Sequence, residues 1–261
     1  MDPGELLMHH FFVKNNDIEG ESIRLSGPDR HHAEDVLRLR IGEEVLISDE
    51  DGKDYRCSLA SSDEESLIFE ISERLESDHE LPSEVWLFQG LPKSDKMELI
   101  IQKATELGVS HIVPVSTKNT VVQLDEKKAV QKLRRWQAIA EAAAKQSKRS
   151  RIPKVHEPMS FRRAAELAGE FEVSVIPYED EHGIESLCEA IVGFIPGRRI
   201  GVIIGPEGGF DPLEVRYAKS RGVLPVSLGK RILRTETAAI AMLSMVMIRL
   251  EISEGVFSEE G

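Results

Sequence analysis

The chain has 261 residues, 41% of them hydrophobic, and a formal net charge of −13 at pH 7. This length allows one large domain or two ordinary ones with a real hydrophobic core. No apolar stretch reaches the roughly 18 residues of a membrane span, and no secretory signal is expected, because the first residues lack a basic start followed by an apolar run. The two cysteines, Cys57 and Cys188, lie far apart in the sequence, which favours reduced thiols and a cytoplasmic location.

Residues 1–78 are expected to form a small β-barrel. Short β-rich runs are separated by Gly, Asp or Ser turns, at 11–13, 21–25, 44–48, 55–60 and 66–71. One helix is expected at 32–39, with Val36 and Leu39 on one side. Several short strands with one helix are typical of a small barrel. The segment 78–83, which carries charge, a Pro and a Ser, is the best candidate for a linker.

Residues 83–255 show alternating strands and helices, which predicts an α/β domain with a parallel sheet and helices on both faces. Strands are expected at 85–88, 111–115, 173–176, 200–204 and 223–228, and helices at 95–107, 126–147, 184–191, 211–221 and 235–251. Asp95 and Glu98 have the spacing of a capping box, and Gly108 fits a left-handed C-cap. Asp211, Pro212 and Glu214 fit the first positions of another helix.

Two glycine loops follow two of these strands. The first is Gly205-Pro206-Glu207-Gly208-Gly209-Phe210, and the second is Leu228-Gly229-Lys230-Arg231-Ile232-Leu233-Arg234-Thr235-Glu236-Thr237. Glycine lets backbone amides approach a small molecule closely. Neither loop has the pattern of a P-loop or of a dinucleotide-binding turn. Two strand ends with such loops can face each other across one ligand pocket.

The charges are unevenly distributed along the chain. The net negative charge taken alone argues against a nucleic acid partner, whose phosphates favour Lys and Arg. A basic segment nevertheless stands out, with Lys145, Lys148, Arg149, Arg151 and Lys154 within ten residues. On charge alone, a phosphate-gripping segment and an ordinary solvated helix face are equally good interpretations.

These motifs resemble the ribosomal RNA uridine-N3 methyltransferase family (RsmE) of the SPOUT superfamily. The resemblance covers nearly the whole chain. It includes His31-His32, Val36-Leu37-Arg38, Lys93, the run 102–109, and Gln146-Ser147-Lys148-Arg149 with Ile152-Pro153. The segment 116–122 departs from the family pattern, because Lys118 stands near the place where an Arg-Ser pair is frequent and cannot form a bidentate fork.

The resemblance implies a fold, a cofactor and a set of site residues. It implies a trefoil knot in the catalytic domain and a PUA-like N-terminal barrel that helps to bind substrate. The implied cofactor is S-adenosylmethionine, held by Pro177, Gly205, Glu207, Gly208, Gly209, Leu228, Gly229, Ile232, Leu233, Arg234, Thr237 and Ala238. The expected RNA contacts are His32, Arg38, Lys93, Lys145, Gln146, Lys148, Arg149 and Arg151.

The implied reaction is methylation of uridine N3, whose imide proton must be lost. Arg149 and Arg234 are interpreted as clamps on phosphate or base, whereas Glu207 either takes part in catalysis or only hydrogen-bonds its loop. No residue is identified as the base. The histidine pairs at 9–10 and 31–32 lack the spacing of a metal site, so no metal is expected.

The implied partners are 16S ribosomal RNA in the small subunit and a second copy of the chain, with the active site at the subunit interface. Two alternatives stay open. One is another SPOUT methyltransferase that acts on transfer RNA or on a ribose 2′-hydroxyl. The other is a non-catalytic RNA-binding assembly factor that keeps the fold.

Overall fold

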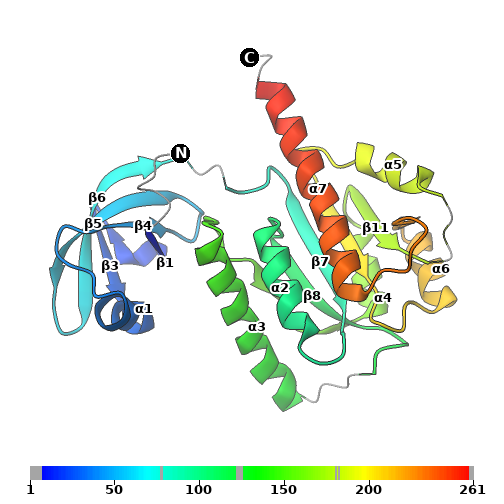
Figure 1. The fold of residues 1–261 in the computed structure, drawn as a ribbon, viewed down its shortest axis with the longest axis horizontal. Coiled ribbons are helices and arrows are strands. Elements are labelled where there is room, and N and C mark those ends of the chain that lie inside the picture. Colours follow the sequence, from blue (N-terminus) through cyan, green and yellow to red (C-terminus); the bar gives the residue numbers. More distant parts are fainter. Residues whose placement is uncertain (1–7, 77–78, 122–125, 180, 182, 259–261) are drawn as a thin grey trace. The chain divides into compact units, whose positions relative to one another are not determined.

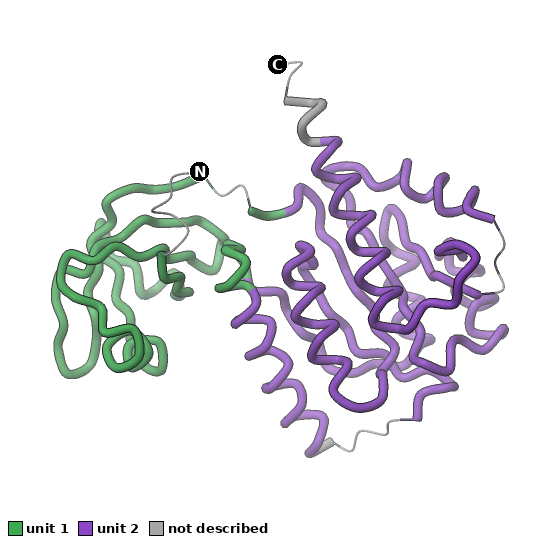
Figure 2. The backbone as a smooth tube through the Cα atoms, in the orientation of Figure 1, with its two compact units in different colours: residues 1–80, 144–151 green, residues 81–143, 152–261 purple. Residues whose placement is uncertain are grey.

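The structure, a computed structural model, describes residues 8–76, 79–121, 126–179, 181 and 183–258. The chain divides into two compact units, residues 1–80 with 144–151 and residues 81–143 with 152–261 (Figure 2). The sequence interpretation places 144–151 inside the second domain, whereas their contacts group them with the first unit. The predicted boundaries, 1–78 and 83–255, stay a prediction, and Asp78 lies outside the described residues.

The first unit is built on one curled sheet of short strands (Figure 1). Its strand order is β1-β4-β5-β6-β3-β2, in which β1 pairs with β4 in parallel and the other pairs are antiparallel. Alternate side chains point inward, so that Phe11, Ile23, Val45, Ile47 and Phe69 form a core that is nearly inaccessible to solvent. The strands are β1 (His9–Phe12), β2 (Ile18–Glu19), β3 (Ser22–Ser26), β4 (Glu44–Ser48), β5 (Asp54–Ser62) and β6 (Ser66–Leu75), with a short 3-10 turn η2 (Asn15–Asp17).

The helix of the first unit differs from the predicted one at 32–39. It begins earlier, as α1 (Gly27–His31), and continues as one π turn, η3 (His32–Val36). Pro28 occupies its first turn, where a missing backbone N–H costs nothing. Val36, expected on one side of the helix with Leu39, is 62% exposed, and the chain leaves the helical conformation at Arg38, which has a left-handed φ of 58°.

The second unit contains a parallel sheet, as predicted from the alternating pattern. Its order is β10-β8-β7-β12-β11-β13, with the short β9 beside β8, and every pairing is parallel. The strands are β7 (Glu84–Gly90), β8 (His111–Ser116), β9 (Lys154–Val155), β10 (Met159–Ser160), β11 (Val173–Pro177), β12 (Arg199–Ile204) and β13 (Leu224–Val226).

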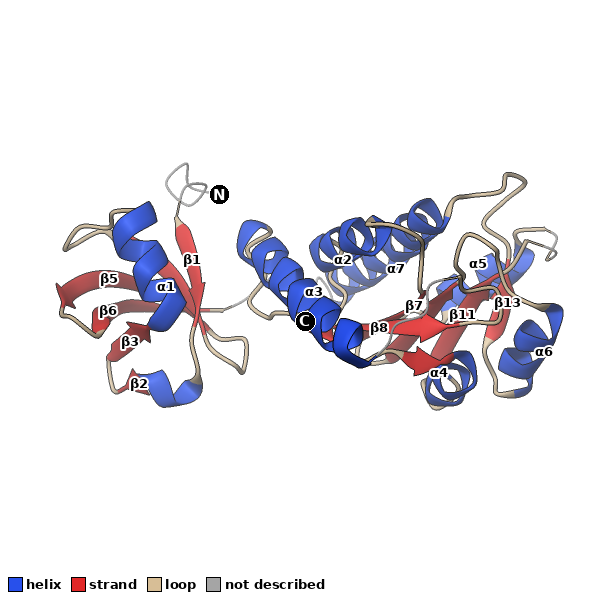
Figure 3. Ribbon diagram, turned by 90° about the horizontal axis from the view of Figure 1, so that it is seen from below, coloured by secondary structure: helices blue, strands red, loops and turns tan. Residues whose placement is uncertain are grey.

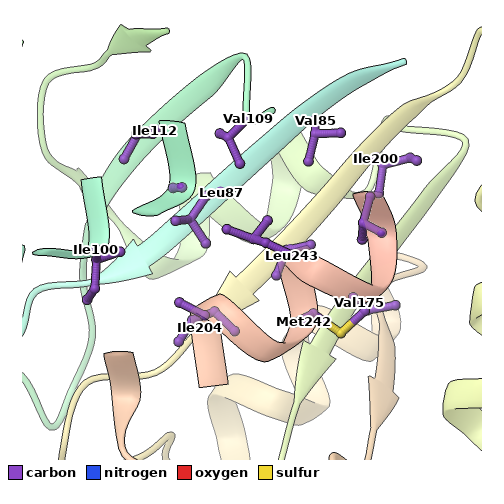
Figure 4. Close-up of a cluster of buried hydrophobic side chains, with 14 of the residues drawn as sticks. Val85, Leu87, Ile100, Val109, Ile112, Val175, Ile200, Ile204, Met242 and Leu243 are labelled. Atoms are coloured by element: carbon purple, nitrogen blue, oxygen red, sulfur yellow. The ribbon is translucent and has the colours of Figure 1, made fainter. Parts of the chain in front are cut away.

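Helices cover both faces of this sheet, as Figure 3 shows. Leu87 points into the core under α2, α3, α5 and α7, part of which Figure 4 shows, whereas Phe88 points into the core under α4 and α6. The predicted α/β architecture is therefore confirmed, and the knot stays a prediction. The helices are α2 (Lys96–Glu106), α3 (Glu126–Gln146), α4 (Phe161–Ala168), α5 (Glu185–Val192), α6 (Pro212–Ser220) and α7 (Thr235–Ser258). None of them, over the described residues, is long and apolar enough to cross a membrane.

The helix caps follow the sequence in part. Asp211 caps α6 in a complete capping box with Glu214, and Gly108 has the predicted left-handed φ, at 85°. The capping box at Asp95 is wrong, because its side chain accepts no cap hydrogen bond. Glu98 instead forms an ion pair with Arg135 of α3, at 2.7 Å.

Candidate active site

A pocket of about 150 Å³ lies at the carboxyl ends of three neighbouring parallel strands, β11, β12 and β13. This edge is where open α/β sheets bind ligands, because the loops leave the strands there. The pocket lies between the two glycine loops and the loop after β11. Its lining residues are Pro177, Tyr178, Glu179, Ile204, Gly205, Pro206, Gly209, Phe210, Ser227, Leu228, Gly229, Lys230, Arg231, Ile232, Leu233 and Ala238.

Two of the lining glycines have backbone conformations that other residues rarely adopt. The φ angle is 64° at Gly209 and 102° at Gly229. A Cβ added at Gly229 would have no heavy atom within 4 Å, so this backbone faces open space. At Gly205 a Cβ would instead meet the ring of Phe210 at 3.1 Å. The loops thus leave backbone atoms accessible at one wall and pack tightly at the other.

Eight of the twelve residues expected to hold the cofactor line this pocket, namely Pro177, Gly205, Gly209, Leu228, Gly229, Ile232, Leu233 and Ala238. The other four do not line it, namely Glu207, Gly208, Arg234 and Thr237. Sequence reasoning missed the remaining lining residues, of which Glu179, Lys230 and Arg231 are charged. All of them are neighbours of the chosen positions, so including each loop in full would have found them.

The carboxylate of Glu207 turns away from the pocket lining and is held by the segment before α2. Both of its oxygens accept the backbone N–H of Lys93, at 3.1 Å each, and Oε1 lies 3.2 Å from Lys96 Nζ. Burial raises the pKa of Glu207, but the hydrogen bonds from its own backbone, from Lys93 and from Lys96 outweigh that effect and lower it below its usual value. Glu207 is therefore an anion at neutral pH.

Lys96 connects the two glycine loops through its ammonium group. Nζ lies 3.2 Å from Oε1 of Glu207 in the first loop and 3.2 Å from Oε2 of Glu236 at the start of α7. Hydrogen bonds to Glu236 and Glu207 raise the pKa of Lys96. Because the lysine stays charged, it can hold both carboxylates but cannot accept a proton.

The loop after β8 supports the first glycine loop from another direction. Asn119 Nδ2 donates to the carbonyl oxygen of Gly208 at 2.9 Å, and Lys118 Nζ contacts Asp211 Oδ2 at 2.5 Å. This is the segment that departs from the family pattern. Its lysine is engaged with the cap of α6, and the described part of the segment acts on the glycine loop.

Three residues of the basic segment, Lys145, Arg149 and Arg151, belong to the first unit and contact its acidic residues. Arg149 is 3% exposed and forms a bidentate pair with Glu80, at 3.1 and 2.5 Å. Lys145 pairs with Asp29 at 2.8 Å, and Arg151 donates to the Asp51 carbonyl oxygen at 2.7 Å. The structure thus places Arg149 in a buried ion pair rather than at the surface. Of the other predicted RNA contacts, Lys148 is half-buried, and His32, Arg38, Lys93 and Gln146 are exposed.

Comparisons with known proteins identify the family of the chain. Residues 79–247 match the model of an RNA methyltransferase domain, and residues 25–72 match that of an RNA methyltransferase PUA domain. The Ribosomal RNA small subunit methyltransferase E of Bacillus subtilis is 35% identical, over 95% of this chain and 99% of its own length. The chain belongs to the RsmE family.

Other RsmE proteins show the same relationship. The Mesomycoplasma hyopneumoniae relative is 34% identical, over 91% of this chain and 98% of its own length. The crystal structure of the Neisseria gonorrhoeae RsmE contains bound S-adenosylmethionine. That protein is 30% identical to this chain, with a TM-score of 0.80, and the alignment covers 92% of this chain and 97% of the Neisseria chain. The family and the PUA-like first unit, both expected from the sequence, are confirmed. The match to the RNA methyltransferase domain, residues 79–247, includes the residues that line the pocket and both glycine loops.

Proposed function

We propose that this chain transfers the methyl group of S-adenosylmethionine to N3 of a uridine in 16S ribosomal RNA, within the assembled small subunit. One observation carries the proposal. The pocket at the strand ends is lined by eight residues expected to hold this cofactor, in a chain of the RsmE family. A ribosomal substrate would place the reaction in the cytoplasm.

The lining fits this cofactor. The adenine is uncharged and can be read by backbone amides and carbonyls, which Gly229 leaves accessible, and Leu228, Ile232 and Leu233 supply apolar walls. Lys230 and Arg231, which line the pocket, are proposed to bind the carboxylate of its amino-acid tail, and Glu179 its ammonium or ribose hydroxyls. When bound, the cofactor supplies an electrophilic methyl group on its sulfonium.

The acceptor uridine must be unpaired, because N3 lies in its Watson–Crick edge. As its proton leaves, negative charge develops on O2 and O4, and an arginine can stabilise it. We assign this role to Arg234, which is exposed at the end of the second glycine loop. Glu207 is unsuited to take the proton, because its pKa is lowered and both oxygens already accept hydrogen bonds. Its role is to hold the loop.

The RNA contacts are assigned to exposed side chains. In the second unit these are Lys93 and Arg234, and in the first unit His32, Arg38 and Gln146. Lys145, Arg149 and Arg151 hold the segment 144–151 in the first unit through their contacts. Lys148 lies in the same segment and has a left-handed φ of 58°. Each phosphate contact should contribute a slope of roughly −0.7 to −0.9 to the dependence of log affinity on log salt.

The chain is proposed to act as a homodimer with the active site at the subunit interface. Ile232, which lines the pocket, is 86% exposed, so one apolar wall of the pocket faces solvent in the single chain. On α7, Ile248 is 51% and Ile252 57% exposed, whereas the opposite side of the helix is buried in the core. A second copy that covers these side chains would complete the pocket.

The test is methyl transfer from labelled S-adenosylmethionine to unmodified small subunits and, in parallel, to naked 16S ribosomal RNA. Digestion to nucleosides and mass analysis should identify N3-methyluridine, with the subunit as the better substrate. A ribose-methylated nucleoside, or label in transfer RNA alone, would assign the chain to a sister SPOUT activity. No transfer together with no cofactor binding would favour the non-catalytic assembly factor.

A further inference from the structure

Gln89, a fully buried amide, lies at the end of β7 behind the pocket and is bound to the start of α7. Its Nε2 donates to Thr235 Oγ1 at 2.9 Å and to the Gly90 carbonyl oxygen at 2.9 Å. Thr235, which is 5% exposed, lies at the first position of α7. Its hydroxyl donates in turn to the Gly205 carbonyl oxygen at 2.6 Å. These three residues form a hydrogen-bond relay, Gln89 to Thr235 to Gly205.

The relay has only one direction. The Gly90 carbonyl oxygen can only accept, so it must face the NH₂ group of Gln89 rather than its oxygen. The second proton of that NH₂ group is then directed at Thr235. The threonine hydroxyl has a single proton, and because it accepts from Gln89, it can give that proton to Gly205. Each donor of the relay is thus used once, and the direction is set by the carbonyl group of Gly90.

The relay connects the two walls of the pocket. Gly205 begins the first glycine loop and lines the pocket, and Thr235 lies in the second loop motif, 228–237, where that motif enters α7. The first glycine loop also packs tightly on β7, because a Cβ added at Gly90 would lie 2.6 Å from the backbone nitrogen of Pro206. Gln89 and Thr235 do not line the pocket themselves. Any effect that they have on a ligand must therefore act through the loops.

We propose that Gln89 and Thr235 are positioning residues for the methyl-donor pocket, which hold the two glycine loops at the separation that binding requires. This inference rests on the proposed function for the identity of the ligand, and on the hydrogen bonds alone for the geometry. A buried neutral relay suits this purpose, because it does not weaken with salt as the half-exposed Lys96 bridge does. Holding the loops in advance avoids an ordering cost on binding.

The first test needs no ligand. Thr235→Val keeps the shape of the side chain but removes the hydroxyl, whereas Thr235→Ser keeps the hydroxyl. Amide hydrogen exchange of loops 205–210 and 228–234 should be about tenfold faster in Thr235→Val than in wild type, and near wild type in Thr235→Ser. Thr105→Val is a matched control, because Thr105 is also buried and its hydroxyl donates to a backbone carbonyl, that of Ile101, within α2.

The second test is the equilibrium affinity for S-adenosylmethionine, measured by titration calorimetry. Thr235→Val should weaken binding about tenfold relative to wild type. The affinity of Thr235→Ser should stay within about twofold of the wild-type value, and that of Thr105→Val should be unchanged. Gln89→Met should weaken it about threefold, since the bond from Thr235 to Gly205 can persist. The double variant Gln89→Met with Thr235→Val should bind no more weakly than Thr235→Val alone, because both act through one relay.

Two results would overturn the inference. One is unchanged exchange of both loops in Thr235→Val, and the other is an affinity loss in the double variant equal to the product of the single losses. If wild-type protein binds no S-adenosylmethionine, the proposed function fails, but the exchange experiment still decides whether the relay holds the loops. A general loss of folding would accelerate exchange in α2 as well, and equal acceleration there would count against a local role.

Discussion

Arg149 illustrates at the residue scale how a cation of a basic segment can be held by an acidic side chain of the protein itself. In sequence it stands in a basic segment, and a phosphate contact is a reasonable interpretation. In the structure its guanidinium is buried against Glu80, and the neighbouring Ser150 donates to Asp54 Oδ2 at 2.5 Å. Asp54 also accepts from Ser48 at 2.5 Å, so the segment is fastened to the barrel by buried polar groups.

Arg149→Ala should therefore destabilise the protein, by about 3 kcal/mol in urea denaturation. This is the lower end for a broken buried pair, because the Glu80 side chain keeps 22% of its surface exposed. Arg162→Ala is the matched control, since the pair of Arg162 with Glu166 is largely exposed and should contribute little. Equal unfolding midpoints for the two variants would contradict the structural role of Arg149.

His156, which follows the short strand β9, predicts a pH dependence of the unfolding free energy. Burial lowers the pKa of His156 to about 4, and the nearby His111 and Lys154 act in the same direction. The unfolded chain binds this proton at about pH 6.5, so between about pH 6.5 and 4 the unfolded state holds more protons and stability falls as the pH falls.

His156→Gln should therefore flatten the decrease in unfolding free energy between about pH 7 and 5. The exposed His9→Gln should leave that decrease as it is in wild type. The measurement is urea denaturation at a series of pH values. If the unfolding free energy of His156→Gln falls with pH as steeply as that of wild type, the assignment to His156 is wrong. Burial also lowers the pKa of His111, which accounts for part of the slope that remains in the variant.

At the scale of elements, the sequence predicts the strands of the parallel sheet well. They are buried on both faces and appear as continuous apolar runs such as 200–204, with glycine loops at their ends. The sequence analysis does not predict helix α4, although its buried residues Phe161, Ala164, Ala165 and Ala168 have helical spacing behind the N-cap Ser160, so the signal is present in the chain. The capping box at Asp95 was wrong, because spacing alone does not show that Glu98 is engaged with Arg135.

The pocket walls follow from local sequence, but their supports do not. Gln89 and Thr235 are 146 positions apart, and no pattern in the chain shows that their side chains meet. The same holds for Lys93 and Glu207, which are 114 positions apart. Long-range pairs of polar groups depend on the packing of whole elements, so they become visible only in three dimensions.

The loop after β8 should influence the pocket through the first glycine loop. Asn119→Ala removes the donor to the Gly208 carbonyl oxygen and should weaken S-adenosylmethionine binding about threefold, at the low end for a hydrogen bond because Asn119 is exposed. Ser116→Ala, at an exposed position of the same segment, should have no effect. Titration calorimetry of both variants is the measurement, and identical affinities would show that this loop does not support the site.

For the whole molecule, the proposed dimer predicts which surface is covered in solution. Ile248→Glu places a charge on the exposed side of α7 and should convert the dimer to a monomer, measured by size-exclusion chromatography with light scattering. Val192→Glu introduces the same charge on α5, where Val192 is 69% exposed, and should leave the mass unchanged. A wild-type monomer, or a dimer that survives Ile248→Glu, would contradict the proposed interface.

The proposed methyl transfer requires that the methyl donor binds between the two glycine loops. The measurement that tests it most directly is a titration of S-adenosylmethionine into wild type, Gly229→Ala and Gly222→Ala. Both glycines have left-handed φ angles, 102° and 92°, and open space where a Cβ would be, so the backbone strain is matched. Only Gly229 lines the pocket. We predict a loss of at least about tenfold for Gly229→Ala and none for Gly222→Ala. Equal affinities for the two variants would place the cofactor elsewhere.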